Sequence, residues 1–515
     1  MLWMIMFFTI PSLIKTHSIK KLVRNEVSHM KIDRENDGLA SAKRLHENKT
    51  TPFELVEDAF KQIEIENPKW NAVIHSRKEK ALQEALNKDF SNTLFGGLPI
   101  LVKGLGQDIA DEPSTSGSRL LKNHYAKQTS NFAKALEKAG FIVIGQTNTP
   151  EFGFKNITDP SLYGPTRNPW NRDCTPGGSS GGAAASIVSA MVQISGASDG
   201  GGSIRIPAAF SGLVGLKPTR GRTPIGPGSG RGWQGASISF ALTKSIRDTA
   251  AMMDVLQTVQ ELAAFQTPLF EVGYLNTLQK TASKKFKIAY SLASPVHGPV
   301  SLDAKKSVMM TVDWLRQQGY EVVECTPDID GVALMQSYYT MNAGETAAMM
   351  ENLEKSLQRA LTINDMELMT WTLYNTGKSI SAATYSNSLT AWDTAAETMA
   401  HFHETYDLYL TPTTADTAPL IDAKLQTDEQ IEQMKHVTEL TASEQQTLVW
   451  DMFAASLAIT PFTQQANLTG QPAISLPVYL TKKGLPLGIQ FTAPKGKEDW
   501  LLSIGYEMEQ AGLFI

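Results

Sequence analysis

The chain has 515 residues, of which 19% are charged and 42% hydrophobic. This is the composition of a globular protein, and it excludes a chain that is disordered throughout. The 47 basic and 52 acidic residues leave a net charge of −5, which gives no reason to expect nucleic acid as a partner. Only two cysteines are present, Cys174 and Cys325, so a disulfide framework and an all-cysteine zinc site are excluded.

The first residues differ from the rest of the chain. Residues 1–14 are apolar but too few to span a bilayer, which needs about 20 residues. Basic residues follow this run instead of preceding it, which is not the order of a signal peptide. We interpret residues 1–29 as an N-terminal extension outside the fold, either upstream sequence or a segment with weak membrane association. The missing signal pattern and low cysteine usage favour a cytoplasmic protein.

The N-terminal half alternates helix and strand patterns. Thr51, Pro52 and Glu54 predict a helix start, because Thr51 can cap, proline fits the first turn and Glu54 completes a capping box. Two short apolar runs, 98–102 before Lys103 and 141–144 between glycines, predict buried strands. The alternation indicates an α/β layered fold.

The C-terminal half continues this pattern. Residues 302–318 form an amphipathic run followed by Gly319, which predicts a helix with a glycine stop. Strands are expected at 320–324 and within 407–414. The runs 471–478 and 485–491 predict two further strands joined through a Lys-Lys-Gly turn, as in a hairpin.

Glycine is concentrated in one part of the chain. The window from Gly177 to Gly235 holds 16 of the 38 glycines, yet it also contains apolar runs that must pack. Glycine at this density in a packed region indicates close backbone approaches and positive φ angles. A set of tight turns is the simpler alternative for any single glycine. A site lined by backbone is the functional interpretation of the whole window.

Three residues in and before this window suggest nucleophilic catalysis. Lys103 follows an apolar strand, Ser179 lies in TPGGSSGG, and Ser203 lies in SDGGGSIRIPAAF. A serine needs a base to take its proton, and no histidine occurs between His124 and His297. A buried lysine can serve, although lowering its pKa to near 7–8 requires roughly 3–4 kcal/mol of destabilisation of the charged form. Considered alone, a lysine at a strand end is usually a solvated surface charge, and only the two serines favour the catalytic interpretation of Lys103.

The residues before Ser203 offer hydrogen-bond donors. Consecutive glycines at Gly200, Gly201 and Gly202, together with Ser203, can direct backbone N–H groups at one point and hold the oxyanion of a tetrahedral intermediate. A phosphate-binding loop would use similar geometry, but the required G-x-x-x-x-G-K-[ST] is missing here. Asp199 could orient the loop by accepting hydrogen bonds, or could cap a turn. Arg205 is expected to pair with a carboxylate and hold the same loop.

These motifs together resemble the amidase signature family. The run GGSSGGAAAS is followed, 24 residues after Ser179, by Ser203 in GGSIRIPAAFSGLVGLKPTRGR. The segments GGLPILVKG, LYLTPTT, NLTGQPAISLPV and GLPLGIQF match further family segments in order, so the resemblance covers roughly residues 30–515. It implies one large α/β domain with a mixed central sheet covered by helices on both faces. Within it we place a catalytic core at about 90–235 and a variable substrate region at about 263–460.

The resemblance also implies a catalytic triad. By motif, Ser203 is the nucleophile, Ser179 the bridging serine and Lys103 the base, with a cis peptide bond between Gly178 and Ser179. Gly178 and Asp199 would support the triad. The implied reaction is hydrolysis of a non-peptide amide, linear or cyclic, through an acyl-enzyme. It needs neither a metal nor a cofactor.

Two positions depart from the family pattern. Many members have Lys-Asp where Lys103-Gly104 stands here, and many have glutamine at the position of Ile206. Neither position belongs to the triad. The segments SIRIPA, GLKPTRGRTPIGP and FTQQANLTGQPAISLP look most like the branch of 6-aminohexanoate cyclic-dimer hydrolases. That branch implies a small amide substrate and no obligate partner, and it is compatible with a homodimer.

Three alternatives compete with this interpretation. Residues 178–182 also fit the G-x-S-x-G motif of an α/β-hydrolase with Ser180 as nucleophile, although the preceding residues are a poor strand. The chain could instead be the amidase subunit of a tRNA-dependent amidotransferase, which would work in an assembly. It could also be a binding or scaffold protein that kept the fold and lost activity.

Overall fold

The computed structural model describes residues 32–278 and 284–515, so the prediction for residues 1–29 lies outside the described residues. Residues 32–515 form one compact unit. The boundaries proposed for a catalytic core and a substrate region remain predictions. None of the helices in the described part is long and apolar enough to cross a membrane.

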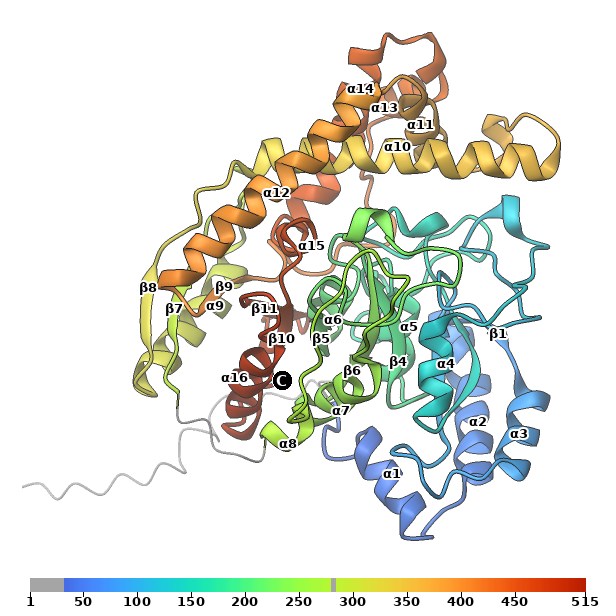
Figure 1. Ribbon diagram of the computed structural model, residues 1–515, viewed down its shortest axis with the longest axis vertical. Helices are drawn as coiled ribbons and strands as arrows, with labels where there is room; N and C mark the ends of the chain where they lie inside the picture. The colour runs from blue at the N-terminus through green and yellow to red at the C-terminus, as the bar shows by residue number, and fades with distance from the viewer. Residues whose placement is uncertain (1–31, 279–283) are drawn as a thin grey trace, which may run out of the picture. The chain divides into compact units, whose positions relative to one another are not determined.

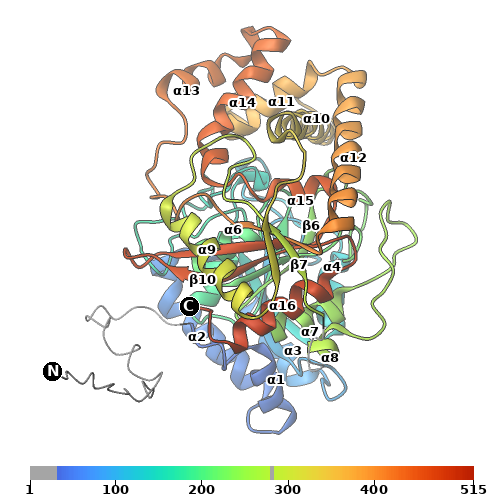
Figure 2. The same cartoon turned by 90° about the vertical axis from the view of Figure 1, so that its left-hand side faces the viewer.

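A mixed sheet of 11 strands runs through the molecule in the order β1-β3-β2-β4-β6-β5-β10-β11-β9-β7-β8 (Figures 1 and 2). Strand β2 is parallel to β3 and β4, whereas β4, β6, β5, β10 and β11 pair antiparallel in turn. The mixed sheet confirms the predicted fold class. The strands are β1 (Val73–Ser76), β2 (Leu98–Lys103), β3 (Phe141–Thr147), β4 (Ser195–Asp199), β5 (Val214–Lys217), β6 (Ile238–Thr243), β7 (Lys287–Tyr290), β8 (Glu321–Glu324), β9 (Leu408–Pro412), β10 (Ala473–Leu480) and β11 (Pro486–Thr492).

Helices cover both faces of this sheet. Ser475 and Leu476 are adjacent on β10 and so point to opposite faces, the first toward α6 and the second toward α16. Helices α5 and α6 contact each other on one face, and α7, α8 and α16 contact one another on the other. The helices are α1 (Gly38–His46), α2 (Pro52–Trp70), α3 (Lys78–Asn87), α4 (Asn131–Lys138), α5 (Gly181–Val188), α6 (Arg205–Ser211), α7 (Ile246–Leu256), α8 (Tyr274–Leu278), α9 (Leu302–Gln317), α10 (Gly331–Leu357), α11 (Leu368–Lys378), α12 (Ala382–Thr405), α13 (Asp428–Lys435), α14 (Ala442–Ile459), α15 (Gln464–Thr469) and α16 (Glu498–Gln510).

The local sequence signals account for the element boundaries. The Thr51 hydroxyl accepts from the Glu54 N–H and the Glu54 carboxylate accepts from the Thr51 N–H, which confirms the predicted capping box at the start of α2. Helix α9 is followed by Gly319 with a φ of +83°, as a glycine stop requires. Strands β10 and β11 pair antiparallel across the Lys-Lys-Gly turn, which confirms the predicted hairpin.

Helices α10, α11, α13 and α14 gather at one end of the molecule, and α12 runs from this end toward β8 and β9 (Figure 1). They enclose a second apolar cluster that is separate from the main core on the sheet. Phe154 and Trp233 come from loops of the N-terminal half and pack against this cluster, with ring centroids 5.6 Å apart. The helical end of the molecule therefore packs against the glycine-rich region, and the cavity described next lies between the two.

Candidate active site

Lys103 is the last residue of β2, and its side chain is only 1% exposed. Its ammonium nitrogen Nζ lies 2.7 Å from Ser179 Oγ and 2.9 Å from Ser198 Oγ. Burial lowers the pKa of Lys103 to about 7, although the negative charge of Asp199 opposes this shift. The surface-charge alternative for Lys103 is wrong, because the side chain is enclosed in the protein.

Ser179 is presented by an unusual backbone. The peptide bond between Gly178 and Ser179 is cis, as the family resemblance implied. Gly178 is packed so closely that a Cβ atom there would lie 2.5–2.7 Å from backbone atoms of Ile157, so only glycine fits. Ser179 itself is 2% exposed and lies just before α5, which begins at Gly181. The chain thus fixes the hydroxyl of Ser179 against Lys103.

Ser203 follows the glycine loop between β4 and α6 and lines the same cavity as Ser179. It is partly exposed, as a nucleophile open to substrate must be. The hydrogen bonds of the described residues do not include one between Ser203 and Ser179. Lys103 and Ser179 are therefore hydrogen-bonded to each other, whereas Ser203 lines the same cavity without a hydrogen bond to Ser179.

Three side chains hold the glycine loop before Ser203 by hydrogen bonds. Asp199 Oδ1 accepts from the Gly202 N–H at 2.6 Å, Tyr338 donates to the Gly200 carbonyl at 3.0 Å, and Thr463 donates to the Gly201 carbonyl at 2.7 Å. Because its N–H is already bound to Asp199, Gly202 is not a free donor. The expected set of four oxyanion donors is thereby reduced to Gly200, Gly201 and Ser203.

Asp199 and Arg205 form a fully buried ion pair beneath this loop. Arg205 Nε and Nη2 each lie 2.9 Å from an oxygen of Asp199, and Asn467 donates to the same carboxylate at 2.9 Å. Burial alone would raise the pKa of Asp199, but the charge and hydrogen bonds of Arg205 hold it below its ordinary value. The expectation that Arg205 pairs with a carboxylate and holds the loop is confirmed.

The cavity has a volume of about 250 Å³, and its wall combines polar residues, among them Lys155, Asn156, Asn342 and Gln464, with aromatic and apolar side chains. These come from the loops of the N-terminal half and from α10 and α14, and include Phe154, Trp233, Met335, Tyr339, Phe453 and Leu457. Ser179, Ser198 and Ser203 also line this cavity. Such a cavity can take an uncharged acyl chain beside a nucleophilic centre.

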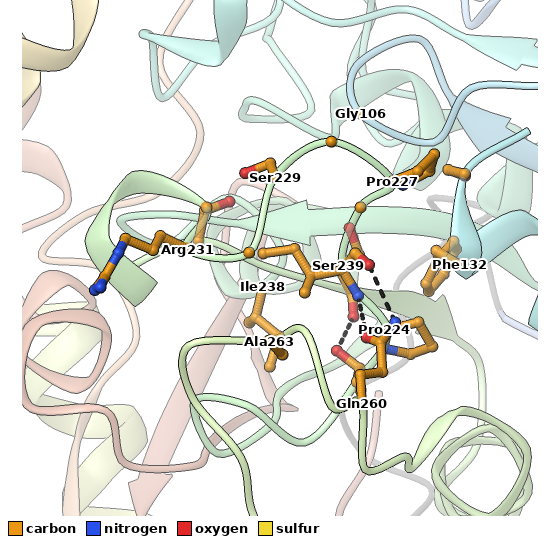
Figure 3. Close-up of a pocket in the computed structure, with 18 of the residues that line it drawn as sticks. Gly106, Phe132, Pro224, Pro227, Ser229, Arg231, Ile238, Ser239, Gln260 and Ala263 are labelled. Carbon is orange, nitrogen blue, oxygen red and sulfur yellow. Dashed lines mark hydrogen bonds between the residues drawn. The ribbon is translucent and has the colours of Figure 1, made fainter. Parts of the chain in front are cut away.

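A second cavity of about 680 Å³ lies next to the first (Figure 3). Its wall includes the glycine-rich loop around Pro227 and Ser229, and Gly106, Ser237 and Ser239 line both cavities. No group of three histidine, cysteine, aspartate or glutamate side chains in residues 32–278 and 284–515 is arranged to hold a metal ion.

Sequence reasoning missed several residues that the fold brings to the site. Ser198 was not singled out, although it lies on the strand just before the glycine loop. Tyr338 on α10 gave no signal in the sequence. Thr463 and Asn467 lie in the segment FTQQANLTGQPA, which was used only as a family marker and could have pointed to them.

Comparison with known proteins gives the class. Residues 54–502 match the Amidase family, and the chain belongs to this family, the amidase signature hydrolases that act on C–N bonds of amides. The alternative of an α/β-hydrolase with Ser180 as nucleophile is thus wrong. No strand of the sheet precedes Ser180 within 154–179, and its hydroxyl is buried and bonded to the backbone of Ser198.

Three relatives place the chain within the family. It is 43% identical to a lipoamidase of Enterococcus faecalis over 91% of this chain, and spans about 62% of the length of that relative. It is 29% identical to a 6-aminohexanoate-cyclic-dimer hydrolase of Paenarthrobacter ureafaciens over 93% of this chain and 96% of the relative. A solved structure of a 6-aminohexanoate cyclic dimer hydrolase complexed with substrate superposes with a TM-score of 0.84 at 28% identity, covering 93% of this chain and 98% of that chain.

Proposed function

We propose that this chain is a serine amidase in which Ser203 is the nucleophile, Ser179 the proton relay and Lys103 the base. The observation that carries this proposal is the enclosed Lys103 side chain, whose Nζ lies 2.7 Å from Ser179 Oγ. A lysine whose pKa is lowered to about 7 has a substantial neutral fraction at neutral pH and can accept a proton, whereas an ordinary exposed lysine is almost fully charged.

The reaction proceeds in two halves. Neutral Lys103 takes the proton of Ser179, which takes the proton of Ser203 as Ser203 Oγ attacks the carbonyl carbon. When the C–N bond breaks, the proton returns through Ser179 to the leaving nitrogen, and an ester with Ser203 remains. Water then attacks that ester, giving its proton to the same relay, and the proton passes back to Ser203 as the carboxylic acid leaves.

The N–H groups of Gly200, Gly201 and Ser203 hold the negative oxygen of the tetrahedral intermediates. Tyr338 anchors the Gly200 carbonyl and thereby fixes the Gly201 N–H, because a trans peptide directs the two groups oppositely, whereas Thr463 anchors the Gly201 carbonyl and thereby fixes the Gly202 N–H toward Asp199. Loss of one oxyanion donor typically costs about 2.7–4 kcal/mol of transition-state stabilisation. Asp199 and Arg205 support this loop from below without touching the substrate.

We assign the acyl side of the amide to the 250 Å³ cavity. Its aromatic walls favour an uncharged aliphatic acyl group. The name of the Enterococcus relative makes a lipoyl amide the first substrate to test, and the 6-aminohexanoate cyclic dimer is the second. A medium-length linear acyl group is our preferred class.

A covalent probe tests the catalytic assignment. Intact mass after treatment with a fluorophosphonate is compared for wild type, Ser203→Ala, Ser180→Ala and Lys103→Ala. We expect one adduct on wild type and on Ser180→Ala, none on Ser203→Ala and slow labelling of Lys103→Ala. Labelling that disappears in Ser180→Ala but persists in Ser203→Ala would overturn the assignment. Absence of an adduct on every form would favour an inactive scaffold or a subunit that needs its partners.

A substrate series tests the acyl assignment. Primary amides with acyl chains from four to eight carbons are compared in kcat/KM. Because each buried methylene contributes about 0.8 kcal/mol, we expect roughly a four-fold rise per carbon until the cavity is filled. A flat series, or hydrolysis of the cyclic dimer alone, would reject the linear aliphatic class.

A further inference from the structure

The larger cavity beside the acyl cavity has no role in the mechanism so far. It is lined by the loop 226–232, by Phe132 and Gln260 and by Ser237 and Ser239 of the β6 region (Figure 3). Three residues, Gly106, Ser237 and Ser239, line both cavities. A Cβ atom built on Gly106 would meet nothing within 4 Å, so there is open space at this shared boundary.

The sheet provides a common floor for both cavities. Ser239 on β6 is paired with Ser198 on the antiparallel strand β4, and paired residues point to the same face. Ser198 is the residue whose hydroxyl accepts from Lys103. Lys103 therefore contacts Ser198, Ser198 is paired with Ser239, and Ser239 lines the larger cavity.

The geometry of an amide requires a second direction of exit from the reaction centre. A secondary amide is planar and trans, so its acyl chain and its nitrogen substituent extend in opposite directions. If the acyl chain occupies the 250 Å³ cavity, the nitrogen substituent must extend from the reaction centre in another direction. We infer that the larger cavity binds the amine side of the substrate, and that this amine is a large and polar one.

The lining of the larger cavity sets this polarity, because it includes the charged side chains of Asp108, Lys127, Arg220 and Arg231 as well as neutral polar groups. Pro227, Gly228 and Ser229 form an exposed stretch of its wall, and the N–H groups of Gly228 and Ser229 donate to no residue in 32–278 or 284–515. The hydroxyls of Ser237 and Ser239 add further polar groups at the boundary. Phe132 and Pro224 add apolar surface to the lining. Backbone amides and hydroxyls beside flat carbon surface suit a chain of amide groups better than an alkyl chain.

The inference rests on the proposed function, because it assigns the second half of the same substrate. A kinetic comparison can test the amine side of the substrate separately from the acyl side. Amides that share one acyl group form the same acyl-enzyme, so their hydrolysis in the second half is identical. Differences in kcat/KM among them arise in the first half, from how the amine is bound and from its reactivity as a leaving group, and the cavity variants separate the two because they change only the binding.

The experiment compares octanoyl amides of two amine series. One series grows by amide units, from ammonia through glycinamide and diglycinamide to triglycinamide, and the other contains propylamine and hexylamine. Two variants narrow the larger cavity, Ser229→Trp and Ala263→Trp, whose positions lie above and below Ile238 in Figure 3. Ser91→Trp is the matched control, because Ser91 is equally exposed on a loop outside both cavities.

We expect kcat/KM of wild type to rise at least about ten-fold from the ammonia to the triglycinamide amide, and to change less than about three-fold from propylamine to hexylamine. Both narrowing variants should lose most of this ten-fold preference, and Ser91→Trp should keep it. Equal values for all glycine-derived amines, or a preference that neither narrowing variant alters, would overturn the inference while the amidase proposal stands.

A binding measurement separates failure of this inference from failure of the proposed function. N-Acetyl-triglycinamide, which lacks the ammonium group of the free amine, is titrated into Ser203→Ala and into Ser203→Ala carrying Ser229→Trp, and followed by ligand-observed NMR. Binding that Ser229→Trp weakens supports the assignment of the cavity even if wild type hydrolyses no amide, in which case the amidase proposal fails by itself. Binding of equal strength in both forms overturns the cavity assignment.

Discussion

Ser198 Oγ lies 2.9 Å from Lys103 Nζ, so the buried lysine contacts two serine hydroxyls and not one. Ser198 belongs to β4, which lies beside the strand that ends at Lys103. A neutral lysine has one lone pair and two N–H groups. With one N–H directed at Ser198, the lone pair is free to face Ser179.

This contact predicts the effect of Ser198→Ala. The lysine amine loses an acceptor that orients it and that favours its charged form, so its pKa should fall below that of wild type. We expect kcat to fall about ten-fold with KM nearly unchanged, and the acidic limb of the pH profile to move to lower pH. Ser198→Thr, which restores a hydroxyl, should recover part of the rate. A loss of rate without any movement of the limb would make Ser198 a packing residue only.

The pKa of Lys103, lowered to about 7 by burial, predicts the pH dependence of activity. Only neutral lysine is a base, and its fraction rises with pH, so kcat/KM should increase through pH 7 and reach a plateau above about pH 8. Below pH 6 it should fall about ten-fold per pH unit. The rate of fluorophosphonate labelling provides an independent measurement of the same limb. A profile that is flat between pH 5 and 9 would contradict Lys103 as the base.

The sequence predicted the parts of the site that are contiguous in the chain. The glycine loop and the pairing of Arg205 with a carboxylate follow from short motifs, and the cis bond after Gly178 was implied by the family resemblance. The predicted capping box and hairpin are equally local. Tyr338 could not be predicted in the same way, because it reaches the Gly200 carbonyl from a helix 138 residues further along the chain. The bonding of Gly202 to Asp199 was also unpredictable, since a run of glycines does not reveal which N–H group is already satisfied.

The buried pair of Asp199 and Arg205 predicts a large effect on stability. Asp199→Asn leaves the guanidinium of Arg205 without a countercharge in a fully buried position, which should cost about 3–5 kcal/mol of unfolding free energy. Urea unfolding at pH 7 measures this difference. Asp422→Asn is the control, because Asp422 is exposed.

The same variant has a defined pH dependence. The folded pKa of Asp199 is below its ordinary value, so its contribution to stability is present above about pH 4 and is lost as the pH falls further. The stability difference between wild type and Asp199→Asn should therefore shrink below about pH 4. A difference that is constant down to pH 2 would show that the carboxylate charge is not what stabilises Arg205.

The hydrogen bond from Tyr338 to the Gly200 carbonyl predicts a specific loss in Tyr338→Phe. Without it, the peptide between Gly200 and Gly201 is free to turn, and the Gly201 N–H no longer points steadily at the oxyanion. A neutral hydrogen bond contributes about 0.5–1.5 kcal/mol, so kcat should fall up to about ten-fold. KM should change little, because the ring that lines the cavity remains. Tyr339→Phe removes a neighbouring hydroxyl from the same helix without touching the glycine loop, and its loss in kcat should be clearly smaller. Equal losses at the two positions, measured by steady-state kinetics on one amide, would contradict a positioning role for Tyr338.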